Sequence, residues 1–226
     1  MMAQRPRFDA VCFDCDSTLT RIEGIDELAR RVGREAEIAS LTEAAMNGDI
    51  PLEEIYGKRL DIVRPDKAAL AWLAERYAEE MVSGAVETIT TLRRHSKAVY
   101  VVTSGLLQAV AEFACILGLA PAQVHAVEVH FDATGGYQGF DSSSPLCRSD
   151  GKALICRKLA AEHGIVVMVG DGVTDLAARA GGAYVVGYGG VIHRDTMLQE
   201  ADCYISSPLL TATLAALLTE EEQSRP

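Results

Sequence analysis

Three short apolar runs that end abruptly in small or polar residues constrain the fold of this chain most strongly. They span Asp9 to Phe13, Ala98 to Val102 and Ile165 to Val169. Runs of this kind are typical of buried parallel strands. Helical patterns follow two of them, over 106–117 and 175–180. Strand, polar turn and helix in repetition predict an α/β fold with an open, mostly parallel, doubly wound sheet.

The chain between the first two runs holds no convincing strand. Apolar residues recur there at helical spacing in two stretches, 25–32 and 70–77. Ordinary connections are far shorter than this segment. We therefore expect a helical cap, an insertion after the first strand over residues 20–81, that covers the carboxyl ends of the strands. Residues 1–19 and 82–226 would form the α/β core.

Weaker patterns lie in the second half of the chain. Residues 183–186 and 203–205 are further strand candidates. Residues 127–140 alternate around a Gly-Gly turn, which predicts a β-hairpin. The tail from Glu220 to Pro226 is expected to fray.

Charge and cysteine content narrow the classes of function. The 226 residues include 21 Lys and Arg against 32 Asp and Glu, a net charge of −11. Nucleic-acid affinity comes mainly from neutralising phosphates with Lys and Arg, so no nucleic-acid partner is expected. Six cysteines show no disulfide framework, and no apolar stretch is long enough to span a membrane. We expect a reduced, cytoplasmic monomer or homodimer without membrane contact.

Acidic pairs follow the first and third apolar runs. Asp14 and Asp16 stand just past the first run, and Asp171 and Asp175 follow the third. Ligands of parallel sheets bind outside the carboxyl ends of the strands, where these four side chains should converge. A single Asp is often a helix N-cap, but two crowded pairs are costly unless a cation or proton lies between them. Such hard oxygen ligands suit Mg²⁺.

A hydroxyl group and a lysine are expected at the same edge. The second run ends at Thr103-Ser104-Gly105, where backbone N–H groups should be free at the start of a helix, and helix N-termini bind anions. Lys152 opens another helical stretch, although a lone lysine is usually a solvated surface residue. A metal, a lysine, a hydroxyl and free N–H groups around a carboxylate make a phosphoryl-transfer site.

Taken in order, these residues resemble the motifs of the haloacid dehalogenase superfamily of phosphohydrolases. The matching motifs are Asp14-x-Asp16-x-Thr18, Thr103, Lys152 and Gly170-Asp171-Gly172-x-x-Asp175. Within the superfamily, the chain is similar to the phosphoserine phosphatase family over about residues 9–205. The narrower similarity rests on Glu23-Gly-Ile-Asp-Glu-Leu-Ala, on Arg59-Leu-Asp-Ile-Val-Arg-Pro65 and on Gly136-Tyr-Gln-Gly-Phe-Asp141.

The resemblance implies a role for each catalytic residue. Asp14 is expected to attack phosphorus and to form an aspartyl-phosphate. Asp16 is expected to protonate the leaving alkoxide and then to take a proton from the hydrolytic water. Thr103 and Lys152 would hold the phosphoryl oxygens. The implied Mg²⁺ ligands are Asp14, the backbone carbonyl of Asp16 and Asp171, with Asp175 close behind.

The resemblance also implies which residues bind the substrate, a small phosphomonoester. Phosphoserine carries one ammonium and one carboxylate, so Glu23 would bind the ammonium and Arg59 would fork onto the carboxylate. In isolation, each would more often be an ordinary surface charge. Met46 would line the pocket, and Arg194 would reach the substrate carboxylate or an acid of the cap. The other implied substrate-binding residues are Thr103, Ser104, Gly105, Lys152 and Thr174.

Three alternatives stay open. The family commonly carries Ser-Gly-Gly-Phe where this chain has 103–106 (Thr-Ser-Gly-Leu), and Leu146 stands where a Thr is usual, which leaves a related phosphatase for another small phosphomonoester. A dinucleotide-binding oxidoreductase would need a glycine at the position of Asp175, where an acid would repel a pyrophosphate. A phospho-accepting signalling receiver would lack the helical insertion and would not need an acid at position 16.

Overall fold

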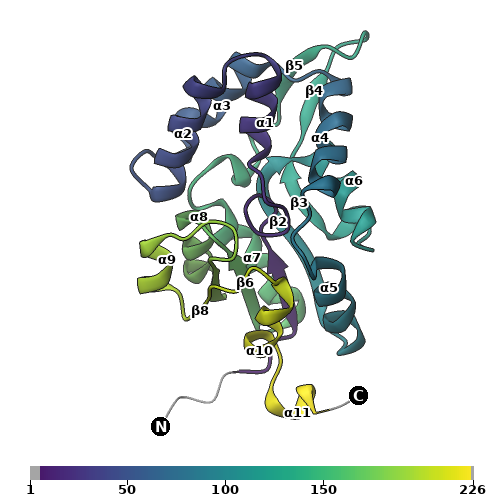
Figure 1. Cartoon of the computed structure of the whole chain (residues 1–226), viewed down its shortest axis with the longest axis vertical. Helices are drawn as coiled ribbons and strands as arrows, with labels where there is room; N and C mark the ends of the chain where they lie inside the picture. Colours follow the sequence, from purple (N-terminus) through teal and green to yellow (C-terminus); the bar gives the residue numbers. More distant parts are fainter. Residues whose placement is uncertain (1–5, 225–226) are drawn as a thin grey trace.

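A six-stranded parallel sheet lies at the centre of the computed structural model, which describes residues 6–224 (Figure 1). The strand order is β3-β2-β1-β6-β7-β8, and each pairing is parallel. The strands are β1 (Ala10–Phe13), β2 (Ala98–Leu106), β3 (Val124–Val127), β6 (Val166–Gly170), β7 (Tyr184–Tyr188) and β8 (Cys203–Ile205). The predicted α/β class and parallel sheet are therefore confirmed.

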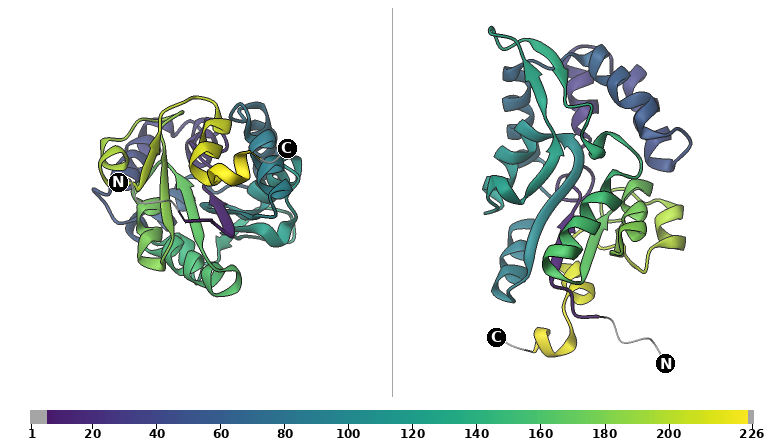
Figure 2. Two further views of the ribbon diagram at one scale, coloured as in Figure 1. Left: turned by 90° about the horizontal axis from the view of Figure 1, so that it is seen from below. Right: turned by 180° about the vertical axis from the view of Figure 1, so that it is seen from behind.

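Helices cover both faces of this sheet. Helices α5 and α6 lie on one face, and α7, α8 and α9 lie on the other (Figure 2). The helices are α1 (Gly24–Arg31), α2 (Glu35–Asn47), α3 (Leu52–Val63), α4 (Lys67–Glu79), α5 (Ala85–Arg94), α6 (Leu107–Ile116), α7 (Gly151–His163), α8 (Val173–Leu176), α9 (Asp195–Glu200), α10 (Leu214–Leu217) and α11 (Glu220–Gln223).

The strand order places the crevice between β1 and β6. From β1 the chain moves outward through β2 to β3, whereas from β6 it moves the opposite way through β7 to β8. Every residue of these two central strands is buried, which explains their uniformly apolar sequences. Since the direction of winding reverses between them, their carboxyl ends border the position where such sheets bind ligands.

Helices α1 to α4 lie above the carboxyl edge of the sheet (Figure 1). Local signals set their ends. Helix α2 stops at Gly48, whose φ of 84° is the left-handed conformation that favours glycine. Helix α4 starts at Asp66, whose carboxylate accepts the N–H of Ala69 at 2.7 Å, a cap that contributes about 1 kcal/mol. The chain between the first two strands of the sheet is thus helical, as the apolar spacing predicts.

The predicted hairpin consists of β4 (Val129–Phe131) and β5 (Tyr137–Phe140), which pair antiparallel outside the main sheet. It packs against the helices above the sheet. The N–H of Lys67 donates to the carbonyl of Gly135 at 2.9 Å, and the rings of Tyr56 and Phe140 lie 5.3 Å apart. The hairpin therefore supports the helix that carries Arg59, although it is far from that helix in sequence.

The expectation of a frayed tail is wrong for the part of it that the structure describes. Residues 220–223 form α11, and Glu222 is held by Lys97 at 2.5 Å and by Arg7 at 2.9 Å. These cations hold the pKa of Glu222 down at about 2, although its burial acts in the opposite direction. Arg225 and Pro226 lie outside the described residues. Within residues 6–224, no helix is both long and apolar enough to cross a membrane.

Candidate active site

A cavity lies between the carboxyl edge of the sheet and the helices above it. The turn after β1, the end of β2, Lys152 of α7 and Thr174 of α8 form its floor, and α1 to α4 contribute to its walls. The predicted site residues that line it are Asp14, Asp16, Glu23, Met46, Arg59, Thr103, Ser104, Gly105, Lys152 and Thr174. Residues that lie far apart in sequence thus meet around one enclosed space.

The tight turn after β1 directs the first acids toward this cavity. The N–H of Asp14 still donates to Val169 of β6 at 2.9 Å, and there the strand ends. The chain then folds back, and the carbonyl of Cys15 accepts the N–H of Leu19 at 2.8 Å. Ser17 adopts a left-handed φ of 51°, which costs about 1 kcal/mol or more in a residue with a Cβ. Strain of this kind is common where a loop must present side chains to a ligand.

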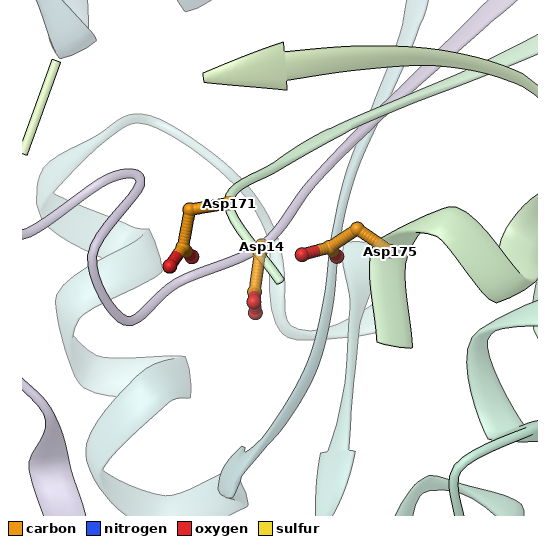
Figure 3. A group of neighbouring side chains, drawn as sticks. All are labelled: Asp14, Asp171 and Asp175. Atoms are coloured by element: carbon orange, nitrogen blue, oxygen red, sulfur yellow. The ribbon is translucent and has the colours of Figure 1, made fainter. Parts of the chain in front are cut away.

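Three carboxylates gather at the ends of β1 and β6 (Figure 3). Asp14, Asp171 and Asp175 each offer an oxygen, and these oxygens lie within 4.8 Å of one another. Lys152 of α7 joins two of them, with Nζ at 2.7 Å from Asp14 Oδ2 and 2.6 Å from Asp175 Oδ1. All four side chains are buried.

The glycines around β6 allow this crowding. A Cβ on Gly170 would lie 2.1 Å from the carboxyl carbon of Asp175, so only glycine leaves room for that side chain. The second oxygen of Asp175 accepts the N–H of Gly172 at 3.0 Å. Both oxygens of Asp175 therefore have partners within the protein, one in Lys152 and one in this backbone amide.

The carboxylate cluster has the donor set that a divalent cation requires. Burial raises the pKa of Asp171 to about 7, with further contributions from Glu23 and Asp14. Burial likewise raises the pKa of Asp175 to about 7 against the opposing effect of Lys152. For Lys152, burial lowers the pKa, but Asp14 and Asp175 outweigh it and raise the pKa overall. Carboxyl groups this close together cannot all ionise without a counter-charge. Their hard oxygen atoms suit a small divalent cation that prefers oxygen ligands.

The side chain of Asp16 lies beside the three-carboxylate cluster and does not belong to it. Its Oδ1 accepts the N–H of Gly24 at 3.1 Å, and the three-carboxylate cluster does not include its side chain. Burial, and then the neighbouring charge of Asp14, raise its pKa to about 7. A carboxyl group that titrates near neutrality can both donate and accept a proton at physiological pH.

The segment after the buried part of β2 is a bulge and not the start of a helix, which corrects the sequence-based expectation. The strand continues to Leu106, which pairs with Val127, and the register shifts between Val102 and Leu106. The hydroxyl of Thr103 accepts the N–H of Gly105 at 3.1 Å. Bulges commonly redirect side chains beside active sites. The hydroxyl of Ser104 is buried and has no hydrogen-bond partner among the described residues.

Glu23 and Arg59 line the cavity together. The hydroxyl of Ser17 donates to Glu23 at 2.6 Å, and burial followed by the charge of Asp16 raises the pKa of Glu23 to about 8. Arg59 donates to the hydroxyl of Thr42 at 3.1 Å, yet its Nε is buried without a partner in the part of the chain that the structure describes. Burial lowers the pKa of Arg59. An unpaired donor in such a wall is costly unless a ligand supplies an acceptor.

Arg194 and Met46 connect the core to the helices above it. Arg194 Nε lies 3.1 Å from Asp171 Oδ2, and its Nη1 donates to Asn47 Oδ1 at 3.0 Å. Arg194 does not line the cavity, and its contact with the substrate carboxylate or with an acid of the cap stays a prediction. The sulfur of Met46 packs against Gly172, because a Cβ added to that glycine would lie 3.1 Å from the sulfur. Leu146 is buried outside the cavity.

Two tyrosines of the cavity wall are absent from the sequence-based site. Tyr56 of α3 donates its hydroxyl to the carbonyl of Ser104 at 2.8 Å. Tyr77 of α4 lines the cavity with its hydroxyl packed against Gly24, where an added Cβ would lie 2.0 Å from the hydroxyl oxygen. Helical spacing could show only that Tyr77 belongs to a buried stripe. That spacing carries no signal to separate a tyrosine facing a cavity from one in the core.

Comparisons with known proteins agree with this geometry. A sequence model of haloacid dehalogenase-like hydrolases matches residues 8–182. A phosphoserine phosphatase of Mus musculus is 32% identical over 200 residues, covering 88% of this chain and 89% of that protein. A chloroplastic phosphoserine phosphatase of Arabidopsis thaliana is 35% identical over 201 residues, covering 87% of this chain and 68% of the relative. A solved phospho-aspartyl intermediate analogue of phosphoserine phosphatase is 27% identical with a TM-score of 0.74, covering 94% of this chain and 100% of the other.

The parallel sheet, the cavity and the sequence matches define the class of protein. The chain belongs to the haloacid dehalogenase-like hydrolase family. It is a phosphoric monoester hydrolase that acts on a small phosphorylated substrate, and the two relatives described above are phosphoserine phosphatases. The dinucleotide-binding oxidoreductase and the signalling receiver are thereby excluded.

Proposed function

We propose that the enzyme hydrolyses O-phosphoserine to serine and phosphate with Mg²⁺, through an aspartyl-phosphate on Asp14. One observation supports this most strongly. A single cavity contains a nucleophilic carboxylate and, in its walls, both a carboxylate at Glu23 and a guanidinium with an unpaired Nε at Arg59. A phosphorylated amino acid is a small phosphomonoester with complementary groups for all three.

In the first step, a carboxylate oxygen of Asp14 attacks phosphorus. The bond between phosphorus and the serine oxygen breaks, and Asp16 transfers its proton to that oxygen as serine leaves. The pKa of Asp16, raised to about 7 mainly by burial, supports this role, because the group is partly protonated near neutral pH. Lys152 and Thr103 would hold the phosphoryl oxygens during the transfer.

In the second step, a water molecule attacks the phosphorus of the aspartyl-phosphate. Asp16, now ionised, takes a proton from this water, and the bond between phosphorus and the Asp14 oxygen breaks to release phosphate. The N–H of Gly24 keeps the Asp16 carboxyl beside Asp14 in both steps. One residue thus acts first as acid and then as base.

Asp14 and Asp171 would hold the Mg²⁺, together with the backbone carbonyl of Asp16. Bound Mg²⁺ would offset the negative charge of the phosphoryl group and of the carboxylates. Asp175 would orient Lys152, because one of its oxygens already accepts from that lysine at 2.6 Å. Arg194 would hold the second oxygen of Asp171, consistent with its ion pair at 3.1 Å.

The helices above the sheet would act as the cap that encloses the substrate. We propose residues 20–81 as this cap, with the β4–β5 hairpin as its support. Contacts between Arg194 and Asn47 and between Tyr56 and Ser104 would close it over the core. The six cysteines are all free, which supports a reducing compartment such as the cytoplasm.

Replacing Arg59 by Ala tests the proposed substrate. The Arg59→Ala variant should raise KM for phosphoserine by on the order of 100-fold, because a buried charge-assisted contact is lost, and should change KM for p-nitrophenyl phosphate little. Steady-state kinetics on both substrates measure this. Lys58→Ala on the exposed side of α3 is the matched control. Failure of the native enzyme to hydrolyse phosphoserine would sink the proposal, and equal effects on both substrates would remove Arg59 from substrate recognition.

Removing divalent cations should abolish activity, and Mg²⁺ should restore it. Binding should also stabilise the fold, by about 2.7 kcal/mol at 100 times the dissociation constant. Thermal denaturation with EDTA and with Mg²⁺ measures this without any turnover. Asp171→Asn should lose the Mg²⁺-dependent rise in Tm, whereas the exposed Asp61→Asn should keep it. Full activity in chelator would contradict the metal site.

A further inference from the structure

Tyr56 is a buried tyrosine of α3 whose hydroxyl bonds to the main chain of β2. The residue lines the cavity and is 4% exposed. Its hydroxyl donates to the carbonyl of Ser104 at 2.8 Å. Its ring packs against Phe140 with the centroids 5.3 Å apart, and the guanidinium carbon of Arg59 lies 5.9 Å from the ring centroid. The hydroxyl and the ring therefore make separate contacts, the first with the sheet and the second with α3 and the hairpin.

The Ser104 carbonyl belongs to a part of β2 that the regular ladder does not hold. Pairing with β1 ends at Val101, and the register with β3 shifts between Val102 and Leu106. Peptide groups inside such a bulge are left out of the regular ladder. The Tyr56 hydroxyl supplies a donor from outside the sheet to one of them.

The same peptide group also contacts Thr103. The peptide bonds of the described residues are trans, so the carbonyl of Ser104 and the N–H of Gly105 point to opposite sides of one plane. The carbonyl points to Tyr56, and the N–H donates to the hydroxyl oxygen of Thr103 at 3.1 Å. Because the peptide is planar and rigid, a bond that fixes one side of it also fixes the direction of the other.

We propose that Tyr56 is a positioning residue that orients the Thr103 hydroxyl for the phosphoryl group, through the one peptide group that contacts both. This inference rests on the proposed role of Thr103 in holding a phosphoryl oxygen. Because the Thr103 oxygen accepts the N–H of Gly105, its own proton points elsewhere and is available to that phosphoryl oxygen. A donor whose direction is fixed before the substrate binds needs no reordering during the reaction.

A packing role alone does not account for the hydroxyl. Phenylalanine would make the same ring contacts with Phe140 and Arg59 without bonding to the sheet. Tyr56 belongs to α3 of the proposed cap, whereas Thr103 belongs to the core. The phosphoryl-binding hydroxyl is therefore held in place only while α3 lies over the sheet, which links enclosure of the substrate to phosphoryl binding.

The test separates the phosphoryl group from the rest of the substrate. Inorganic phosphate and L-serine are compared as competitive inhibitors of p-nitrophenyl phosphate hydrolysis at saturating Mg²⁺. In Tyr56→Phe, the inhibition constant of phosphate should rise on the order of fivefold, the usual effect of losing a neutral hydrogen bond, and that of serine should stay within about twofold. Tyr100→Phe, which removes a hydroxyl bonded to His163 outside the cavity, is the matched control and should change neither constant.

A double variant shows whether Tyr56 acts through Thr103. Thr103→Val should itself raise the inhibition constant of phosphate on the order of tenfold, because a hydrogen bond to a charged oxygen is lost. Adding Tyr56→Phe should then change that constant less than about twofold, since the hydroxyl that Tyr56 orients is gone. Thermal denaturation confirms that each variant is folded. If Tyr56 only held α3 on the core, the two losses would add.

A selective loss of phosphate binding that disappears in the Thr103→Val background supports the proposal. An unchanged phosphate constant in Tyr56→Phe, additive losses, or an equal loss for phosphate and serine would each overturn it. If Thr103→Val binds phosphate as the native enzyme does, Thr103 is no phosphoryl ligand and the inference fails with that role. The proposed substrate is judged separately, since a native enzyme that hydrolyses p-nitrophenyl phosphate but not phosphoserine loses only the phosphoserine assignment.

Discussion

Replacing Asp14 by Asn should reduce turnover by on the order of 10⁴-fold or more, because no other group can form the covalent intermediate. The amide has nearly the same shape as the carboxylate but is a poor nucleophile. Incubation with labelled phosphomonoester should give no acid-stable phosphoprotein in Asp14→Asn and a trapped phosphoprotein in the native enzyme. Asp61→Asn, on the exposed side of α3, is the control and should behave as the native protein does.

The same variant should remain folded. Asp14 lies close to Asp171 and Asp175, and its charge contributes to the raised pKa values of both groups. The substitution relieves this repulsion but removes the ion pair between Asp14 and Lys152. Lys152 keeps its second ion pair, with Asp175. The two effects oppose each other, so the Tm without metal should change little. Near-normal turnover in a well-folded Asp14→Asn protein would remove the nucleophile assignment.

Replacing Asp16 by Asn should slow both chemical steps, by about 10²–10⁴-fold for phosphoserine. With p-nitrophenyl phosphate the two steps separate, because p-nitrophenolate leaves without a proton while hydrolysis of the aspartyl-phosphate still needs a base. Rapid mixing should therefore show a burst of about one equivalent of p-nitrophenolate, followed by slow turnover. This accumulation of the phosphoenzyme is the expected signature of a missing base.

The control for the Asp16→Asn variant is a substitution of the neighbouring acid, Glu23→Gln. Glu23→Gln keeps the acid at position 16 and should show no burst, although it should weaken the binding of phosphoserine. Dephosphorylation at the native rate in Asp16→Asn would contradict the acid and base role.

Convergence of the acids could be predicted from the sequence because it depends on a general property of parallel sheets. Asp14 follows one apolar run and Asp171 another, and the carboxyl ends of parallel strands meet at one edge. The strand order itself was not predictable from the runs. It depends on which strands bury each other, and β1 pairs with both β2 and β6.

Other parts of the site depend on contacts that local sequence does not encode. The sequence pattern predicts that Thr103 ends a strand before a helix, whereas the pairing of Leu106 with Val127 extends the strand and makes residues 103–105 a bulge. The sequence pattern predicts a frayed tail around Glu222, whereas the structure has a short helix there in which Glu222 pairs with Lys97. In each case the deciding partner lies elsewhere in the chain.

The sequence by itself determined the class of fold, the helical nature of the segment between β1 and β2 and the acidic character of the candidate site. Periodicity and residue type encode these features locally. Only the tertiary structure decided which way the side chains face. Arg194 pairs with Asp171 and does not line the cavity, and the hydroxyl of Tyr77 packs against Gly24. These orientations follow from close packing between segments far apart in sequence, where one glycine, Gly24, makes room for one hydroxyl.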